Sequence, residues 1–312
     1  MRARTGFRLA IAAIVTVLSL VFFIYPAVVI CQVAFDATLR STGQSRFVPA
    51  WFEATAGRYI SWADAYLQTE VAQTYHHNDV AATEWPMFGS VFLLVTANDL
   101  QRQGKIDATR GSIREAVDRA VQVVASPITA TWVKSKWGDA YLDSENVFYR
   151  MLLILGLASY EEITADKRYH ELMARQRDGL ASELMAAKYH VLDDYPGECY
   201  PVDVLWSVAA IQRAARLDGT NHDALAQAFM ASLDGPLRDV HGLPPYQVQS
   251  RTGRILQESR GCGDSGLMPF AAELDSVIAA RWYTNYEAAF WKQTKWIAGF
   301  TELPGGVPAD FM

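Results

Sequence analysis

Cysteine is scarce in this sequence, and several short motifs that bind metals, phosphates or dinucleotides are absent from it. The 312 residues include three cysteines, Cys31, Cys199 and Cys262, and no CxxC, HExxH, P-loop or GxGxxG pattern. Such motifs supply the ligands or the close backbone approach that zinc and nucleotide sites need. His76 and His77 with Asp79 form a possible metal corner, but adjacent helical side chains point about 100° apart and rarely share one ion. We therefore expect neither a metal nor a cofactor.

Positive charge is scarce beyond the N-terminus. The net charge is −6, and the first 35 residues hold Arg2, Arg4 and Arg8 but no acid. The remaining residues carry 25 Lys and Arg against 34 Asp and Glu, a net charge of −9. An acidic body without a basic stripe argues against nucleic acid as a partner.

All charge is missing from residues 9–35, LAIAAIVTVLSLVFFIYPAVVICQVAF. About 20 apolar residues span a bilayer core, whereas the apolar region of a cleaved signal peptide has about 7–15 and ends at small residues. This run is longer, and Val28-Val29-Ile30 precedes Cys31. We expect residues 1–35 to form a cytoplasmic tail and an uncleaved signal anchor, with one membrane helix over 9–31.

The arginines before this run favour a cytoplasmic N-terminus. That orientation places residue 58 onward on the periplasmic side of a single-pass protein, with 36–57 as a linker. Arg40 and Arg46, just beyond the apolar run, favour the opposite orientation.

Alternating apolar residues, which typify strands, are rare. The best strand signal is 245–259, PYQVQSRTGRILQES, which predicts a hairpin with Thr252-Gly253 at its turn. Elsewhere apolar residues recur every three or four positions. They predict an all-α fold with helices near 58–76, 82–103, 110–125, 144–161, 166–188, 202–217, 221–233, 265–273 and 276–294.

Two kinds of helix alternate along the chain. Those near 82, 144, 202 and 265 are apolar nearly all round, as inner helices are, and those between them are amphipathic, as outer helices are. The inner helices open at Glu84, Glu145, Asp203 and Asp264, in steps of 61, 58 and 61 residues. A repeat near 60 residues predicts an (α/α) toroid of helical hairpins over 58–312.

We expect this ring to be incomplete. A six-hairpin toroid needs more than the four inner–outer units that the sequence contains. The last residues, 296–312, read as a loop toward a fifth inner helix, so the toroid domain would be truncated at the C-terminus.

In a ring, the acidic starts of the inner helices gather at one mouth. Acids in a first turn also complement the helix macrodipole, worth about 0.3–1 kcal/mol each, so capping is the alternative. The loops before these helices add aromatics and further acids, as in 131-TWVKSKWGDAYLDSEN-146 and 193-DDYPGECYPVD-203. Such a mouth suits a small-molecule or sugar site. Gly261 and Gly263, which flank Cys262, indicate close backbone approach or a tight turn there rather than a core position.

Five motifs within 137–215 carry a resemblance: WGD at 137–139, EN-hydrophobe-x-Tyr at 145–149, RYHELM at 168–173, GECYP at 197–201 and SVAAI at 207–211. Together they resemble the linalool dehydratase/isomerase family, within the six-hairpin α/α toroids. The resemblance implies a cavity where acid/base groups eliminate water from, or isomerise, a small terpene-like alcohol without a cofactor. It matches Cys199 to the first of two family cysteines and Asp139 to an acid. The places of the second cysteine and of a histidine fall near Leu205 and Leu152.

The first hypothesis is therefore a membrane-anchored lyase or isomerase with a small-molecule substrate. Its catalytic candidates are Cys199, Glu198, Asp139, Tyr200 and Asp264. Its substrate-binding candidates are Trp137, Trp132, Tyr141, Glu145, Tyr149, Asp203 and Glu84.

Two other functions stay open, and the oligomeric state is open too. A glycoside hydrolase would pair carboxylates from Asp139, Glu198, Asp203 and Asp264, about 6.5–9.5 Å apart if inverting, and stack sugars on the two tryptophans. A non-catalytic binding domain on a membrane anchor is the other alternative. Cys199 is a catalytic thiol, an inert packed residue, or half of a disulfide with Cys262.

Overall fold

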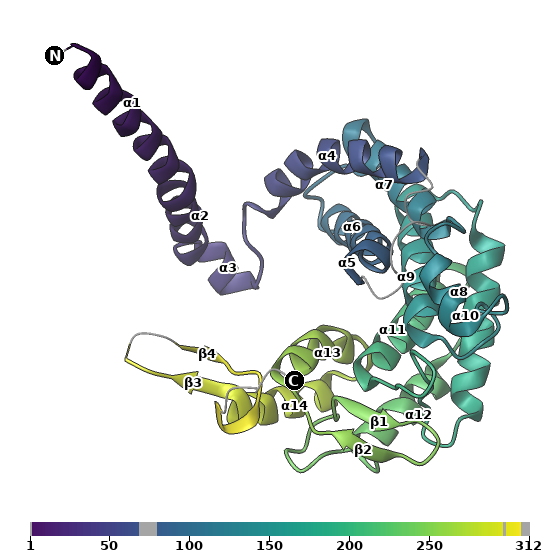
Figure 1. The fold of residues 1–312 in the computed structure, drawn as a ribbon. Coiled ribbons are helices and arrows are strands. Elements are labelled where there is room, and N and C mark those ends of the chain that lie inside the picture. The colour runs from purple at the N-terminus through teal and green to yellow at the C-terminus, as the bar shows by residue number, and fades with distance from the viewer. Residues whose placement is uncertain (1, 69–79, 296–297, 307–312) are drawn as a thin grey trace. The chain divides into compact units, whose positions relative to one another are not determined.

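The computed structural model describes residues 2–68, 80–295 and 298–306, and its elements are shown in Figure 1. The described chain is mostly helical with a few short strands, which confirms the all-α prediction. It divides into two compact units, Met1–Ala56 and Gly57–Met312.

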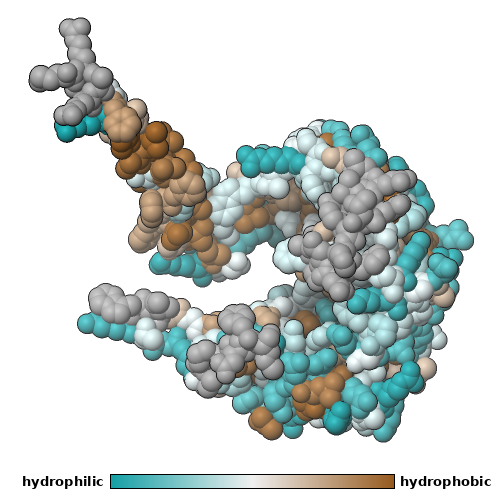
Figure 2. All heavy atoms as spheres, viewed as in Figure 1, coloured by the Kyte–Doolittle hydropathy of each residue, from teal (hydrophilic) through white to brown (hydrophobic). Residues whose placement is uncertain are grey.

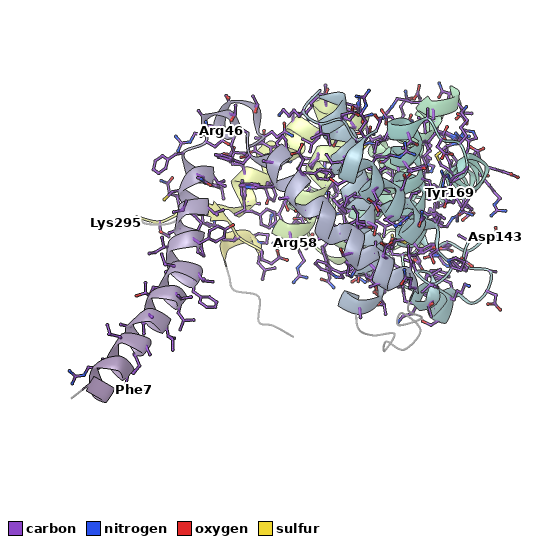
Figure 3. All side chains as sticks on the ribbon, turned by 90° about the horizontal axis from the view of Figure 1, so that it is seen from above. Phe7, Arg46, Arg58, Asp143, Tyr169 and Lys295 are labelled. Carbon is purple, nitrogen blue, oxygen red and sulfur yellow. The ribbon has the colours of Figure 1, made fainter. Side chains whose placement is uncertain are left out.

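The first unit is dominated by one long apolar helix. It comprises α1 (Arg2–Ser19), a π-helical turn (Leu20–Ile24) and α2 (Tyr25–Ala34). From Gly6 to Ala34 it is long and apolar enough to cross a membrane, and none of it is buried. Figure 2 shows this segment as a mainly brown, apolar rod, and Figure 3 shows its side chains, from Phe7 on, projecting around the helix. By length and composition this helix qualifies as a membrane span, and a signal sequence near an N-terminus can satisfy the same two criteria.

The segment expected as a linker contains helices. Asp36 caps α3 (Ala37–Thr42) by accepting the Thr38 N–H at 3.0 Å. Its other oxygen accepts the Ser45 hydroxyl at 2.7 Å and the Arg46 N–H at 2.9 Å. The hydrogen bond from the Thr38 hydroxyl and these contacts hold the pKa of Asp36 well below its usual range. The next helix, α4 (Val48–Gln68), begins ten residues before the predicted 58–76 helix, whose last part lies outside the described residues.

The second unit has the predicted alternation of inner and outer helices. The inner helices are α6 (Trp85–Arg102), α9 (Val147–Thr164), α11 (Pro201–Asp218) and α13 (Gly261–Leu274). The outer helices are α7 (Gly111–Ala125), α10 (His170–Ala186), α12 (Asp223–Asp234) and α14 (Ser276–Phe290). Two short helices not predicted are α5 (Val80–Thr83) and α8 (Thr131–Trp137).

Each inner helix packs against the next one along the chain. The outer helices α7, α10 and α12 each pack against the inner helix before them and the one after them. Helix α9 is buried over most of its length because α6, α7, α10 and α11 surround it. A Cβ on Gly156 would lie 3.0–3.1 Å from Val124 and Val91, so glycine allows α9 to approach α6 and α7 closely.

Contacts between inner helices join positions about one repeat apart. The Trp206 indole donates to the Gly266 carbonyl at 2.9 Å, 60 residues along the chain, and Arg213 pairs with Glu273, again 60 residues along. The Gln101 amide donates to the Ile163 carbonyl at 3.3 Å, 62 residues along. The N-terminal part of one helix contacts the N-terminal part of the next, and C-terminal parts contact C-terminal parts. The inner helices therefore run in the same direction. Closure into a toroid, complete or incomplete, stays a prediction.

The predicted hairpin is present as β1 (Gln247–Gln249) and β2 (Arg254–Gln257), with Gly253 in the left-handed region at its turn. The prediction of a helix to residue 294 is wrong, because α14 ends at Phe290. A second hairpin follows, β3 (Trp291–Gln293) with β4 (Ala298–Phe300), and then a 3-10 turn (Pro304–Gly306). Thr301 donates its N–H to the Phe290 carbonyl at 2.9 Å, so pairing with a later segment ends the helix.

Candidate functional site

A cavity of about 390 Å³ lies at the N-terminal ends of the inner helices. Its walls come from the start of α6 and the residue before it, the start of α9, the loop before α11, the first part of α11, the residue before β1 and the start of α13. The lining residues are Glu84, Phe88, Phe148, Tyr195, Tyr200, Val202, Asp203, Trp206, Tyr246, Cys262, Gly263 and Gly266. Glu84 and Asp203, the acidic starts of two inner helices, therefore line the same space.

Six aromatic residues line the cavity, and three of them, Phe88, Phe148 and Trp206, lie close together. The Phe88 ring centroid lies 6.2 Å from that of Phe148 and 6.4 Å from that of Trp206. The hydrogen bond from Trp206 to the Gly266 carbonyl fixes the indole. Sequence reasoning missed these rings, but their spacing is a usable signal. Phe88 lies four residues after Glu84 and Trp206 three after Asp203, which places each ring on the same helix face as its acid.

The carboxyl groups of Glu84 and Asp203 are half-buried beside these rings. Burial raises the pKa of Glu84, against the opposing effect of a hydrogen bond with Tyr195. Burial and then the charge of Glu84 raise the pKa of Asp203 to about 7. Carboxyl groups whose pKa values are raised by burial in a cavity are candidates for acid/base chemistry.

A third carboxyl group lies behind this pair. Asp194 is buried, and one of its oxygens accepts the Tyr200 N–H at 2.7 Å. Its other oxygen has no hydrogen-bond partner within the part of the chain that the structure describes. Burial and then the charge of Asp203 raise the pKa of Asp194 well above its usual range. Asp194 was not among the sequence candidates, although the paired acids at 193–194 were a signal for it.

The thiol that lines the cavity belongs to Cys262. Cys199 is buried outside the lining, and its carbonyl accepts the Val248 N–H at 3.0 Å. Burial and then the charge of Asp194 raise the pKa of the Cys199 thiol well above its usual range. Both cysteines are free, so the disulfide alternative is wrong in this structure.

The other catalytic candidates differ in their exposure to solvent. Asp139 and Glu198 are exposed, and Glu198 accepts the Tyr200 hydroxyl at 2.9 Å. Tyr200 itself lines the cavity. Asp264 is buried next to the lining residue Gly263, and one of its oxygens has no hydrogen-bond partner among the described residues. Burial, then the charges of Asp239 and Glu302, raise the pKa of Asp264 to about 8.

The remaining substrate-binding candidates do not line this cavity. Trp132 is buried, with its ring centroid 6.2 Å from that of Phe148 and 6.0 Å from that of Tyr149. The Trp137 indole donates to the Asp194 carbonyl at 3.3 Å. Tyr141 meets the Tyr149 ring edge-on, 5.4 Å between centroids.

Glu145 belongs to a different part of the mouth. It accepts the Asp193 N–H at 2.9 Å and lines a separate cavity of about 310 Å³ with Arg251. The acidic starts therefore fall into two places: Glu84 and Asp203 line the main cavity, with Asp264 beside it, and Glu145 lies elsewhere.

Within residues 2–68, 80–295 and 298–306, no three His, Cys, Asp or Glu side chains are grouped to hold a metal ion. The corner of His76, His77 and Asp79 lies outside the described residues. Neither a protein-family model nor a curated protein sequence matches the chain.

Proposed function

We propose that this protein is a cofactor-free lyase or isomerase that acts on a small, largely apolar alcohol by acid/base chemistry. The observation that carries the proposal is that Glu84 and Asp203 line one cavity together with six aromatic residues. A pocket that is mostly apolar with a few convergent polar groups is typical of small-molecule sites. The resemblance to linalool dehydratase/isomerases points to the same substrate class, and a toroid of hairpins remains the proposed architecture.

The proposed elimination divides the proton transfers between the two carboxyls. Asp203, in its protonated form, gives a proton to the substrate hydroxyl while the carbon–oxygen bond breaks. Glu84, in its ionised form, removes a proton from the adjacent carbon, and the electrons of that bond form the new double bond. Water leaves, and proton exchange with solvent restores both carboxyls. In an isomerisation, water returns to a different carbon by the reverse steps.

The pKa of Asp203 gives this mechanism a pH dependence. The acid must be protonated, and burial with the charge of Glu84 raises its pKa to about 7. We expect kcat/KM to fall as the pH rises above about 7, since Asp203 of the free protein then ionises.

The carbohydrate alternative has less support from the geometry. Trp132 is buried and Trp137 bonds to the loop backbone, so neither tryptophan is presented to the cavity for sugar stacking.

The function is tested with purified full-length protein in detergent and linalool as substrate, with diene and isomer products measured by gas chromatography. We expect Asp203→Asn and Glu84→Gln each to lower kcat by about 10²–10⁴, the usual contribution of a general acid or base. Asp143→Asn, which changes an exposed carboxylate in the loop before α9, is the matched control and should keep full turnover. Turnover by both cavity variants at the wild-type rate would rule out the assignment.

We further propose that the apolar N-terminal helix is an uncleaved anchor and that residue 58 onward lies in the periplasm. Arg2, Arg4 and Arg8 before the apolar run support this orientation. A reporter enzyme that folds only in the periplasm, fused after residue 60, should be active. A mature protein that begins near residue 32 would contradict the anchor.

A further inference from the structure

The segment after β4 is seated directly on the start of α13. The Glu302 carbonyl accepts the Gly261 N–H at 2.9 Å, and the Gly261 carbonyl accepts the Tyr286 hydroxyl at 3.1 Å. A Cβ on Gly261 would overlap the Thr301 carbonyl oxygen, so only glycine leaves room for this segment. The segment therefore packs at the start of the helix that provides Cys262 and Gly263 to the cavity wall.

The Glu302 side chain is bound from three directions. One carboxylate oxygen accepts the Cys262 N–H at 3.0 Å, and the other accepts the Cys262 thiol at 3.2 Å. The Arg260 guanidinium lies 3.2 Å from that second oxygen and also lies over the Tyr246 ring, 4.9 Å from its centroid. Backbone, thiol and guanidinium thus fix the position of one carboxylate at the edge of the cavity.

This arrangement determines how the thiol meets the cavity. A thiol has one S–H group to donate, and here it donates a hydrogen bond to a Glu302 carboxylate oxygen. The lone pairs of the sulfur remain available to a molecule in the cavity that Cys262 lines. A substrate hydroxyl is a donor that they can accept.

We propose that Cys262 contacts the molecule bound in the cavity and that Glu302 is the positioning residue that orients its thiol. The inference rests on the proposed function for the ligand class, a small apolar alcohol. Cys199 has no comparable role, because it is buried away from the lining.

Thiol alkylation tests the contact. Full-length protein in detergent is treated with iodoacetamide, and each cysteine peptide is followed by mass spectrometry. We expect Cys262 to react in the native protein and Cys199 to react only after unfolding. The saturated alcohol 3,7-dimethyloctan-3-ol should slow Cys262 alkylation at least about fivefold. Equal Cys262 rates with and without this alcohol would overturn the contact.

The pH profile of alkylation tests the positioning role. Partial burial raises the pKa of Cys262, and the hydrogen bond and charge of Glu302 raise it further. Glu302→Gln removes that charge, so the profile should shift to lower pH, with an alkylation rate at pH 7.5 at least about threefold above wild type. Glu302→Asp keeps the charge but is one methylene shorter, so it should shift the profile less than Glu302→Gln does.

Glu287→Gln is the matched control, since it removes an exposed carboxylate from α14 and should leave the profile unchanged. An unchanged profile in Glu302→Gln would overturn the positioning role. Alkylation needs no turnover, so these results are independent of whether linalool is converted.

Discussion

The pKa values of the carboxyl groups differ between the two ends of the inner helices. At the N-terminal ends, Glu84, Asp203 and Asp264 have raised pKa values, and burial is the largest cause in each case. Among the described residues that line the cavity there is no Lys or Arg. At the C-terminal ends, acids pair with arginines, as Asp218 does with Arg177 at 2.7 Å.

At the C-terminal ends, hydrogen bonds from arginine lower the pKa values of the acids. Hydrogen bonds from Arg168 lower the pKa of Asp166 to about 2. Burial opposes the shift at Asp218, but hydrogen bonds from Arg177 and Thr220 bring its pKa to about 2. Asp99 is an exception, since burial raises its pKa despite the nearby Arg213. Acids with strongly perturbed pKa values occur preferentially at functional sites. The N-terminal ends of the inner helices have such acids, whereas the acids at the C-terminal ends form ion pairs that hold helices together.

The largest effect on stability should come from Arg177, which is 2% exposed and bonds both Asp178 and Asp218 at 2.7 Å. Removing one partner of a buried ion pair leaves an uncompensated charge, at a cost of about 3–5 kcal/mol. Asp178 and Asp218 keep some solvent access, so we expect Arg177→Met to lower the free energy of unfolding by about 2–3 kcal/mol. Urea denaturation followed by circular dichroism measures this.

Arg175→Met, on an exposed position of the same helix, is the control and should change stability by less than about 0.5 kcal/mol. Equal losses in the two variants would remove the structural role assigned to the C-terminal ends.

A smaller effect, of opposite sign, is expected for Asp264→Asn. The folded pKa of Asp264 is raised to about 8, so between about pH 4 and 8 the folded state binds more protons than the unfolded state. Stability due to this group is therefore complete at low pH and is lost as the pH rises toward 8. Asparagine stays neutral, and we expect the variant to be more stable than wild type by at least about 1 kcal/mol at pH 8.5.

The same denaturation series at pH 4 should show little gain, because wild-type Asp264 is then protonated. A gain of the same size at both pH values would mean that the burial of its charge is not the cause.

The smallest effect is expected for Arg251, a cation near the acidic mouth. Its side chain is 84% exposed and lies 3.6 Å from Glu145. Exposed ion pairs contribute about 0.2–1 kcal/mol at most, so Arg251→Ala should change unfolding by less than about 0.5 kcal/mol in 150 mM salt. A larger loss would show that the start of α9 depends on this ion pair and would weaken the comparison.

Much of this fold was predictable from local pattern. The order of inner and outer helices follows from apolar spacing, and the β1–β2 turn follows from Thr252-Gly253. The close backbone approach predicted at Gly261 and Gly263 is present, with the Thr301 carbonyl at the first and the Tyr246 ring at the second.

The candidate site was less predictable because distant segments build it. The motif at 197–201 drew attention to Cys199 and Glu198, yet the side chain of Cys199 is directed into the core and that of Glu198 to the surface. Glu302 reaches Cys262 from 40 residues away, and no local spacing indicates such a contact. The β3–β4 hairpin is hidden for the same reason, since its pairing replaces an amphipathic pattern that continues past Phe290.

Contacts between inner helices join residues 60 positions apart, as in Trp206 with Gly266 and Arg213 with Glu273. This spacing affects how local unfolding spreads through the protein. When each helical unit bonds mainly to its neighbour, stability is close to a sum of unit and interface terms. A destabilising substitution in one helical unit then weakens that unit and its interfaces with adjacent units, rather than all the units. The α13–α14 unit, which carries Cys262, has a described inner-helix neighbour on one side, α11. Its amide hydrogens should therefore exchange with solvent before those of α9, which has inner-helix neighbours on both sides.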